Sequence, residues 1–413
     1  MALAQRSTLK NAAAQRTRSA AAPRAAFSSP VVAQLRQAAQ SVRAAQQPAA
    51  QRNVKAQAAA VETTQAKPEV YNKSQFELYT LTTWLLQEER KGKIDSELAT
   101  VISSISLACK QIAAAVGRSG ISSLTGVAGT GENVQGEEQK KLDVISNDIF
   151  CNCLRMSGRT GVIASEEEAT PVAVEETDSG NYIVVFDPLD GSSNIDAGIS
   201  VGSIFGIYEP SETCVVDGDL DQSLEACITN VCQPGKNLLV AGYCLYSSCH
   251  TMVLTIGDGV YGFTLDPYVG EFVLTHNRIQ VPEVGKIYSF NEGNYAMWDE
   301  PTRKYMDSLK EPSKWGGKPY SARYIGSLVG DFHRTLLYGG IYGYPGDAKN
   351  KNGKLRLLYE CAPMSFIAEQ AGGMGSTGKE RVLDIQPTEV HQRVPLMIGS
   401  KKEVEYYESF YKN

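Results

Sequence analysis

The chain has 413 residues, with 40 Lys and Arg against 46 Asp and Glu, and a formal net charge of −6. Its length allows two domains, and 42% hydrophobic residues supply enough apolar surface for a buried core. Nine cysteines are too few for a secreted disulfide scaffold of this length. No run approaches the roughly 20 apolar residues of a membrane span, so we expect a soluble protein without a membrane partner.

The first 61 residues have a composition of their own. They contain nine Lys or Arg and no Asp or Glu, and they are rich in Ala, Gln and Ser. A basic, acid-free segment is typical of a transit peptide, and we expect cleavage near residues 54–61. The alternative is a disordered basic arm that binds an anionic partner. Without this segment, residues 62–413 carry 31 basic and 46 acidic residues, a net charge of −15 that disfavours nonspecific binding to nucleic acid.

Helical patterns dominate residues 74–117. A first amphipathic helix is followed by a second that is predicted to begin near Asp95 and to end at Gly117. Strands and loops then follow, and a second α/β half ends in a predicted helix over residues 404–411. The pattern divides the chain after the N-terminal segment into two domains, residues 62–279 and 280–413.

The most informative stretch is residues 187–194, which follow the apolar run 182–186 of a predicted buried strand. A proline and a glycine inside the stretch disfavour continuation of the strand, so Asp187 and Asp190 are expected to project together from its end. Two carboxylates with a free backbone carbonyl between them suit a hard cation. The alternative is an Asx-type turn with solvated acids. Donors for a bound anion follow at Gly191, Ser192 and Ser193.

Further acids follow apolar runs elsewhere in the chain. Residues 162–164 predict a strand that ends in Glu166, Glu167 and Glu168, whose charges would repel one another without a cation or shared protons. The chain has only four histidines, so the inventory of ligands is typical of magnesium rather than zinc. Other candidate acids are Glu137, Asp143 and Glu360.

One glycine-rich motif points elsewhere and is rejected. Residues 373–378 match a dinucleotide-binding fingerprint and, with Lys379, nearly match a nucleotide P-loop. Both phosphate loops must follow a strand, whereas the preceding residues 362–371 predict a helix. Glu380 also stands where a P-loop needs Ser or Thr. The motif therefore predicts a glycine turn that ends a helix.

Several segments resemble one known family, in that family's order. Residues 166–208 are similar to the fructose-1,6-bisphosphatase family, and the acidic core of the loop at 187–194 is shared with inositol phosphatases. The likeness runs from about residue 70 to the end. It implies an α/β fold, a layered α-β-α-β-α sugar-phosphatase sandwich of two α/β halves, assembled as a homotetramer. Further motifs of the family lie at residues 290–293, 322–327, 333–335, 344–345, 352–360 and 391–393.

The resemblance assigns a chemical role to the acids. It implies that Glu167, assisted by Asp143, takes a proton from an attacking water that metals activate, without a covalent phosphoenzyme. Glu137 stands where the family has an aspartate, so its reach to a metal differs by one methylene. His333 and His391 lie among apolar residues or beside Arg, so they are predicted to be structural. No Ser or Cys shows a paired His, which agrees with direct attack by water. The resemblance implies two or three Mg²⁺ held by Glu137, Glu166, Asp187, the Leu189 carbonyl, Asp190 and Glu360.

The resemblance also implies how a sugar bisphosphate is bound. Lysine, arginine and tyrosine suit a phosphate, and Arg323 would reach in from a neighbouring subunit. Asn294 is an additional residue relative to the family, which displaces Tyr295. For the tyrosines the alternative is ordinary packing, since the chain has 20 of them. The implied substrate contacts are Gly191, Ser192, Ser193, Asn291, Tyr295, Arg323, Tyr324, Tyr344 and Lys354.

Three cysteines lie in a long polar segment, residues 209–235, between two predicted strands. In the family this region is extended with cysteines in the chloroplast enzyme, which thioredoxin activates by reduction. The resemblance therefore implies a regulatory disulfide between Cys214 and Cys227, with Cys232 as the alternative partner. A bridge on an exposed loop would be accessible to a thiolate, and it would pull on the preceding strand and disturb the metal site. The alternative is three unpaired thiols.

A nucleotide site of the gluconeogenic family members is missing. Their basic residue before the strand at 182–186 is Asn181 here, and their threonine-rich helix start is replaced by residues 93–97. Without the basic residue a nucleotide phosphate loses its charge partner, so we expect weak or no inhibition by AMP.

Taken with the resemblance, the sequence predicts Mg²⁺-dependent hydrolysis of the 1-phosphate of fructose 1,6-bisphosphate to fructose 6-phosphate and phosphate. We expect this reaction in the Calvin cycle of the chloroplast stroma, under control of an f-type thioredoxin. Two alternatives stay open: hydrolysis of sedoheptulose 1,7-bisphosphate, and non-catalytic sensing of a sugar phosphate. The cysteine segment favours the first sugar, and the retained acids favour catalysis.

Overall fold

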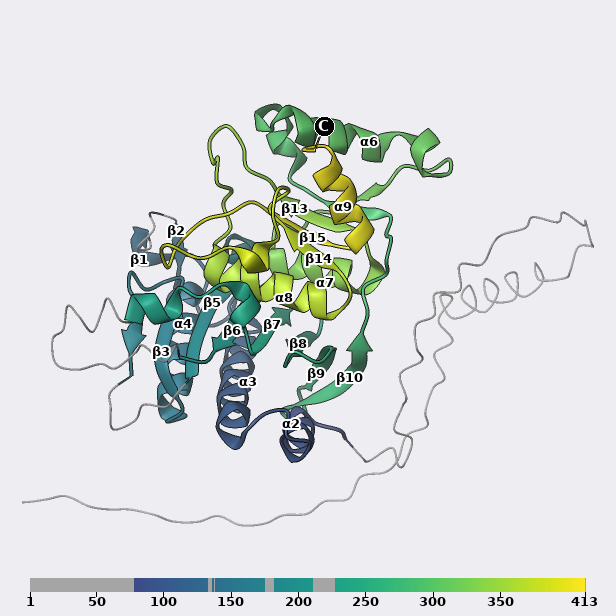
Figure 1. Ribbon diagram of the computed structural model, residues 1–413. Helices are drawn as coiled ribbons and strands as arrows, with labels where there is room; N and C mark the ends of the chain where they lie inside the picture. Colours follow the sequence, from purple (N-terminus) through teal and green to yellow (C-terminus); the bar gives the residue numbers. More distant parts are fainter. Residues whose placement is uncertain (1–77, 133–135, 137, 175–181, 211–226, 413) are drawn as a thin grey trace, which may run out of the picture. The chain divides into compact units, whose positions relative to one another are not determined.

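The computed structural model describes residues 78–412 except 133–135, 137, 175–181 and 211–226 (Figure 1). Predictions for the N-terminal segment and for Glu137, Asn181 and Cys214 therefore lie outside the described residues.

Side-chain caps set the start of the first two helices in the described part of the chain. α2 (Leu81–Arg90) begins after Thr80, whose hydroxyl accepts a hydrogen bond from the N–H of Thr83. α3 (Ser96–Val116) begins after Asp95, whose carboxylate accepts from the N–H of Leu98. The predicted start near Asp95 and end at Gly117 are confirmed.

By length and composition alone, α3 is apolar enough to cross a membrane, so the prediction that no run approaches a membrane span is wrong; a core helix of a soluble protein passes the same test. In the fold it is a core helix. Its buried face packs with α4 (Lys141–Met156) in one apolar core, and serines and threonines such as Thr100 and Ser103 occupy its exposed face. A short hairpin of β1 (Val127–Glu132) and β2 (Glu138–Lys140) precedes α4.

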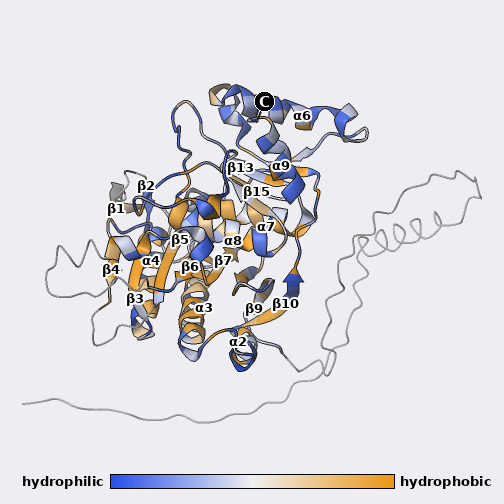
Figure 2. Ribbon diagram, in the orientation of Figure 1, coloured by the Kyte–Doolittle hydropathy of each residue, from blue (hydrophilic) through white to orange (hydrophobic). Residues whose placement is uncertain are grey.

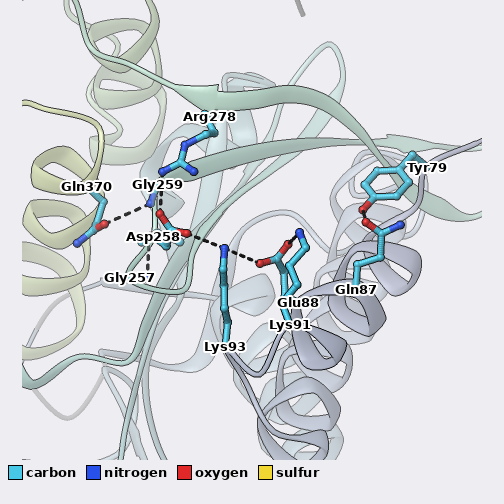
Figure 3. A network of polar contacts seen from close by, with 11 residues as sticks. Tyr79, Gln87, Glu88, Lys91, Lys93, Gly257, Asp258, Gly259, Arg278 and Gln370 are labelled. Atoms are coloured by element: carbon cyan, nitrogen blue, oxygen red, sulfur yellow. Dashed lines mark hydrogen bonds and ion pairs between the residues drawn. The ribbon is translucent and has the colours of Figure 1, made fainter. Parts of the chain in front are cut away.

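Charged side chains fasten the turn between α2 and α3 to the sheet beside it. The Lys93 ammonium lies 3.0 Å from the buried Glu88 carboxylate and 2.6 Å from Asp258 (Figure 3). Arg278 also pairs with Asp258, at 2.7 Å. Lys93 is thus held between two acids from different parts of the chain.

Eight strands form one mixed sheet in the order β10-β9-β8-β7-β6-β5-β3-β4. β3 and β5 are parallel, and the other neighbours are antiparallel. The central strands β5 and β6 are buried at every position, as expected of strands covered on both faces. The strands are β3 (Thr160–Ser165), β4 (Val172–Ala173), β5 (Tyr182–Asp190), β6 (Val201–Tyr208), β7 (Val240–Tyr246), β8 (His250–Thr255), β9 (Val260–Asp266) and β10 (Glu271–Ile279).

β5 does not end where the sequence predicts. The prediction that Pro188 stops the strand is wrong, because β5 continues to Asp190. Asp187 pairs with Ile204 and Asp190 with Gly202, so β5 holds one residue more than β6 over this interval. This is a β-bulge, where a proline is tolerated because the ladder is already interrupted. The bulge redirects the strand at the two aspartates.

A second sheet of five strands has the order β12-β11-β13-β15-β14. The predicted helices over 362–371 and 404–411 are confirmed as α8 (Ala362–Gln370) and α9 (Lys401–Ser409). The glycine-rich motif is only partly a turn, since Gly372 has a φ of 84° and Met374–Ser376 then form β14. The other elements are β11 (Ile287–Ser289), α6 (Glu300–Lys310), β12 (Ser321–Ala322), α7 (Leu328–Tyr338), β13 (Ile341–Tyr344) and β15 (Leu396–Gly399).

Three apolar cores alternate with the two sheets. One core joins α2, α3 and α4 to the first sheet, the second joins the other face of that sheet to α7, α8 and the second sheet, and the third joins the second sheet to α6 and α9. Figure 2 shows apolar residues on the central strands and α8, and polar residues along α2, α6 and α9. This order of helices and sheets confirms the predicted α-β-α-β-α layers.

Candidate active site

Three carboxylates meet at the end of β5. Asp187 and Asp190 come from the bulge, and Glu360 comes from a π-helical turn, Leu357–Cys361. One oxygen of each acid lies within 4.8 Å of the others, and all three side chains are buried. Burial and the neighbouring carboxylates raise their pKa values, to about 6 for Asp190 and about 8 for Glu360. A cation would relieve this repulsion, and an oxygen-only set of ligands suits Mg²⁺.

The start of α7 holds Asp190 in place. The Asp190 carboxylate accepts hydrogen bonds from the Ser327 hydroxyl at 2.7 Å and from the N–H of Val329 at 3.0 Å. Ser327 is the N-cap of α7, so the acid lies at the positive end of a helix. Gly191 follows with a φ of 75°, and a Cβ there would lie 3.0 Å from the Cβ of Ser327. Glycine is therefore required where the chain turns into the 3₁₀ helix Ser192–Ala197.

Arg356 is a buried cation among these acids, and the sequence prediction gave it no role. Its guanidinium lies 3.2 Å from Glu166 Oε1, and the main-chain N–H of Arg356 donates to Glu360 Oε2 at 2.6 Å. The N–H of Glu166 donates to the carbonyl of Phe186, which joins the end of β3 to β5. A signal was present, because Arg356 lies inside the motif at residues 352–360.

Asp143 and Glu167 line the same cleft as the three acids. Asp143 is in the first turn of α4, is buried, and accepts from the N–H of Lys140 at 2.7 Å. Burial, together with the charges of Glu167 and Glu166, raises the pKa of Asp143 to about 7. Glu167 accepts from the amide of Gln139 at 2.6 Å. An acid that is half-ionised near neutral pH, beside a second oriented carboxylate, can take part in proton transfer.

Neither His333 nor His391 lines this cleft in the described part of the chain. His333 Nδ1 lies 2.7 Å from the hydroxyl of Tyr243, and His391 Nδ1 lies 2.8 Å from that of Tyr359. Burial lowers the pKa of both histidines, to about 4 for His333. Both rings have hydrogen-bond partners inside the fold, as a structural histidine requires.

The cleft has a volume of about 930 Å³ and brings the acids together with most of the expected substrate residues. Among the described residues, Arg323 and Tyr295 do not line it. Arg323 is exposed, and the Tyr295 hydroxyl donates to Asp307 at 2.8 Å. Asn294, the additional residue, lines the cleft instead. The expected residues that line it are Gly191, Ser192, Ser193, Asn291, Tyr324, Tyr344 and Lys354.

The prediction from sequence missed several cations of this cleft. Lys140 and Lys349 lie outside the motifs, and lysine side chains are common on surfaces, so they gave no signal. Arg356 and Arg393 lie inside the motifs at residues 352–360 and 391–393, but neither was given a role in the cleft. The unassigned cationic lining residues are Lys140, Lys349, Arg356 and Arg393.

Two of the three expected redox cysteines are described. Cys227 lies in a helical segment whose described part is residues 227–231, and Cys232 follows it. The expectation of an exposed cysteine loop is wrong for these two, which are 2% and 9% exposed and pack in the core between the sheets. Burial raises the pKa of the Cys232 thiol, and its carbonyl accepts from Gln386 Nε2 at 2.7 Å.

The layered fold and the acidic cleft define an α/β protein with a candidate metal centre beside a wall that carries lysine, arginine and tyrosine side chains. Residues 79–277 match the family model "Fructose-1-6-bisphosphatase, N-terminal domain", and residues 281–412 match the corresponding C-terminal domain. The chain therefore belongs to the fructose-1,6-bisphosphatase family, and it is an enzyme of that family.

Known proteins support this assignment over most of the chain. The chloroplastic fructose-1,6-bisphosphatase of Brassica napus is 69% identical over 356 residues, which cover 85% of this chain and 86% of the relative. That of Triticum aestivum is 71% identical over 340 residues, which cover 82% of this chain and 83% of the relative. The crystal structure of holo Leishmania major fructose-1,6-bisphosphatase matches with a TM-score of 0.76 at 43% identity, covering 82% of this chain and 100% of that one.

Proposed function

We propose that this enzyme hydrolyses the 1-phosphate of fructose 1,6-bisphosphate with Mg²⁺, giving fructose 6-phosphate and inorganic phosphate. The observation that carries the proposal is the buried cluster of Asp187, Asp190 and Glu360 in a cleft that Lys354 and several tyrosines also line. The acids supply sites for cations at one phosphate, and the lysine and tyrosines supply donors for another. A sugar with two phosphates needs both.

The described acids fit Mg²⁺ as the bound metal. Three buried carboxylates with raised pKa values repel one another, and their oxygens form the ligand set that this cation prefers. Bound Mg²⁺ would polarise the phosphoryl group and lower the pKa of a nearby water. The residues that would hold two or three ions are Glu166, Asp187, the Leu189 carbonyl, Asp190 and Glu360, with Glu137 as a further ligand.

Glu167 is proposed as the base that removes a proton from the attacking water. Its hydrogen bond from Gln139 fixes the orientation of the carboxylate. Asp143, with a pKa of about 7, would share that proton near neutral pH. The bond from the water oxygen to phosphorus forms as the bond from phosphorus to the sugar oxygen breaks. The leaving oxygen then takes up a proton.

The second phosphate is assigned to the other residues of the cleft wall. Asn291, Tyr324, Tyr344 and Lys354 supply one charge and several uncharged donors. Arg323 is exposed, which suits donation to a neighbouring subunit of the proposed homotetramer. Asn294 lines the cleft where Tyr295 does not, which supports it as the contact in place of Tyr295.

We further propose that the enzyme acts in the Calvin cycle in the chloroplast stroma and is activated when thioredoxin reduces a disulfide of Cys227. The chloroplastic relatives and the acid-free N-terminal segment support the location. Burial of Cys227 in the core between the sheets supports coupling of the disulfide to the fold. Cys214 is the proposed partner, with Cys232 as the alternative.

Phosphate release tests the proposal. Phosphate release should be measured from fructose 1,6-bisphosphate and from sedoheptulose 1,7-bisphosphate. Each measurement is made in Mg²⁺ and in EDTA, and before and after dithiol reduction of the enzyme. We expect faster release from the fructose substrate, loss of activity in EDTA and activation by the dithiol. Faster release from the sedoheptulose substrate would favour the related activity, and binding of either sugar without release would favour a sensor. A Cys214→Ser enzyme that still needs dithiol at low Mg²⁺ would contradict the proposed disulfide.

A further inference from the structure

His391 joins two segments that carry acids of the site. Its Nε2 lies 3.1 Å from the main-chain carbonyl of Glu168, at the end of the loop that follows β3. Its Nδ1 lies 2.8 Å from the hydroxyl of Tyr359, the residue before Glu360 in the π-helical turn. One imidazole thus bridges the loop of the proposed base and the turn of a proposed metal ligand.

The two hydrogen bonds define the state of the ring. A carbonyl oxygen can only accept, so Nε2 must carry the proton and donate it to Glu168. Nδ1 then accepts from the Tyr359 hydroxyl. Burial lowers the pKa of His391, which favours this neutral form. With both nitrogens engaged, and the Tyr359 ring packed at 5.9 Å and 70° to it, the imidazole has a fixed orientation.

The loop that carries His391 is itself fastened to the π-helical turn. The carbonyl of Gln392 accepts from the N–H of Leu357 at 2.7 Å, and Arg393 pairs with Arg356 in an antiparallel bridge. The Gln392 side chain accepts from the N–H of Thr388 at 2.8 Å. The segment that carries His391 is therefore hydrogen-bonded to the turn that carries Glu360.

The contact at Glu168 is one residue from the proposed base. Rotation of the peptide at Glu168 would reorient Glu167, and displacement of a reacting group by about 1 Å can lower a rate by about 100-fold. Asn147 holds the Glu168 side chain at 2.8 Å, but that bond does not connect the loop to the turn of Glu360. The Arg356–Glu166 ion pair connects the start of this loop to the turn, and the His391 bridge connects the part of the loop beyond Glu167.

We propose that His391 is a positioning residue that sets Glu166 and Glu167 against Glu360 by holding the Glu168 peptide. His391 is not among the described residues that line the cleft, so its role is one of positioning. The role of Glu167 as a base rests on the proposed function, whereas the effect on the geometry of the acids does not.

Two substitutions of His391 separate the effect of its bond to Glu168 from that of its bond to Tyr359. In His391→Gln the amide nitrogen reaches about as far as Nε2 and can still donate to Glu168. In His391→Asn the side chain reaches only as far as Nδ1, so the bond to Glu168 is lost. His333→Asn is the matched control, because it makes the same change in another buried histidine–tyrosine pair away from the cleft, where Nδ1 lies 2.7 Å from the Tyr243 hydroxyl.

Steady-state kinetics and a titration with Mn²⁺ alone, followed by electron paramagnetic resonance, give independent measures. For H391N we expect kcat to fall about 10- to 100-fold, KM to change little, and Mn²⁺ affinity to fall about tenfold. H391Q should recover most of both losses, and H333N should lower the melting temperature without either loss. If H391N keeps the kcat and Mn²⁺ affinity of the parent, or if H333N loses as much, the proposal is overturned.

Two further outcomes are informative. If the parent enzyme releases no phosphate from fructose 1,6-bisphosphate, the proposed function fails, and the Mn²⁺ titration still tests the bridge. If H391N does not fold, Tyr359→Phe replaces it, because this change frees one side of the imidazole and removes a single oxygen. A Y359F enzyme should show smaller losses in the same direction, and unchanged kcat and Mn²⁺ affinity would overturn the proposal.

Discussion

Replacement of Asp187 by asparagine should stabilise the metal-free enzyme while it abolishes activity. The carboxylate of Asp187 lies within 4.8 Å of two other buried carboxylates. Two unit charges at that distance repel by about 3 kcal/mol at an effective dielectric constant of about 20. Protonation already relieves part of this repulsion, as the raised pKa of Asp187 indicates. We therefore expect Asp187→Asn to raise the free energy of unfolding by about 1–3 kcal/mol at pH 8 in EDTA.

Urea unfolding in EDTA and in Mg²⁺ measures both parts of this prediction. The control is Asp331→Asn, at a buried aspartate that accepts from the N–H of Ile325 at 2.9 Å and pairs with Arg334. That substitution weakens a satisfied network and should lower the stability by about 1–3 kcal/mol. The same chemical change thus has opposite signs at two buried sites. Two results would refute the reasoning that these acids repel one another and together bind a cation. One is an Asp187→Asn enzyme that is less stable than the parent in EDTA, and the other is one that gains as much stability from Mg²⁺ as the parent does.

Three further predictions follow from the described contacts. The gain in melting temperature from Mg²⁺ should grow from pH 6 to pH 8. The pKa values of Asp190, Asp143 and Glu360 are raised to about 6, 7 and 8, so the metal-free fold loses stability as these acids deprotonate. A gain that is independent of pH would contradict this. Millimolar AMP should inhibit phosphate release little, because the side chains at the start of α3 already have partners within the fold. Lys93 is paired with two acids, and Asp95 caps α3 and accepts from a tyrosine hydroxyl. Strong inhibition would refute that account. Gln386→Leu should shrink the difference between oxidised and reduced activity, because it removes the bond to the Cys232 carbonyl, and an unchanged ratio would remove this contact from the regulatory path.

The helix boundaries near the N-terminal end were predictable because local chemistry sets them. Asp95 caps α3 through its own side chain, and Gly117 ends the same helix. The end of β5 was not predictable in this way, because a bulge depends on pairing with β6 as well as on the strand's own residues. Pro188 breaks an ordinary ladder, but at a bulge its missing N–H costs nothing.

The same distinction holds within the site. Asp187, Asp190 and Glu360 were found because each follows an apolar run and has a chemistry that is costly to bury. Arg356 was missed because its role arises from Glu166, which lies far away in the sequence. The placement of Tyr295 was missed for a similar reason, since only the fold brings Asp307 to its hydroxyl.

The π-helical turn Leu357–Cys361 shows why the two halves of the chain must fold together to form the site. The N–H of Cys361 bonds to the carbonyl of Arg356, five residues back, and the extra residue in this turn brings Glu360 to the aspartates of β5. Such turns are rare, occur mostly at functional sites, and leave no periodic pattern in a sequence. The turn is supported from outside, by the segment 386–393.

That segment also offers a physical route from the cysteines to the acids. Gln386 contacts Cys232, His391 contacts Glu168, and Gln392 contacts Leu357. A displacement of the helical segment at 227–231 would therefore reach the loop of Glu167 and the turn of Glu360. None of these three contacts involves the tyrosines or the lysine proposed for the second phosphate. Oxidation of the cysteines should for this reason change kcat and the half-saturating Mg²⁺ concentration more than KM for the sugar, and a pure change in KM would require a different route.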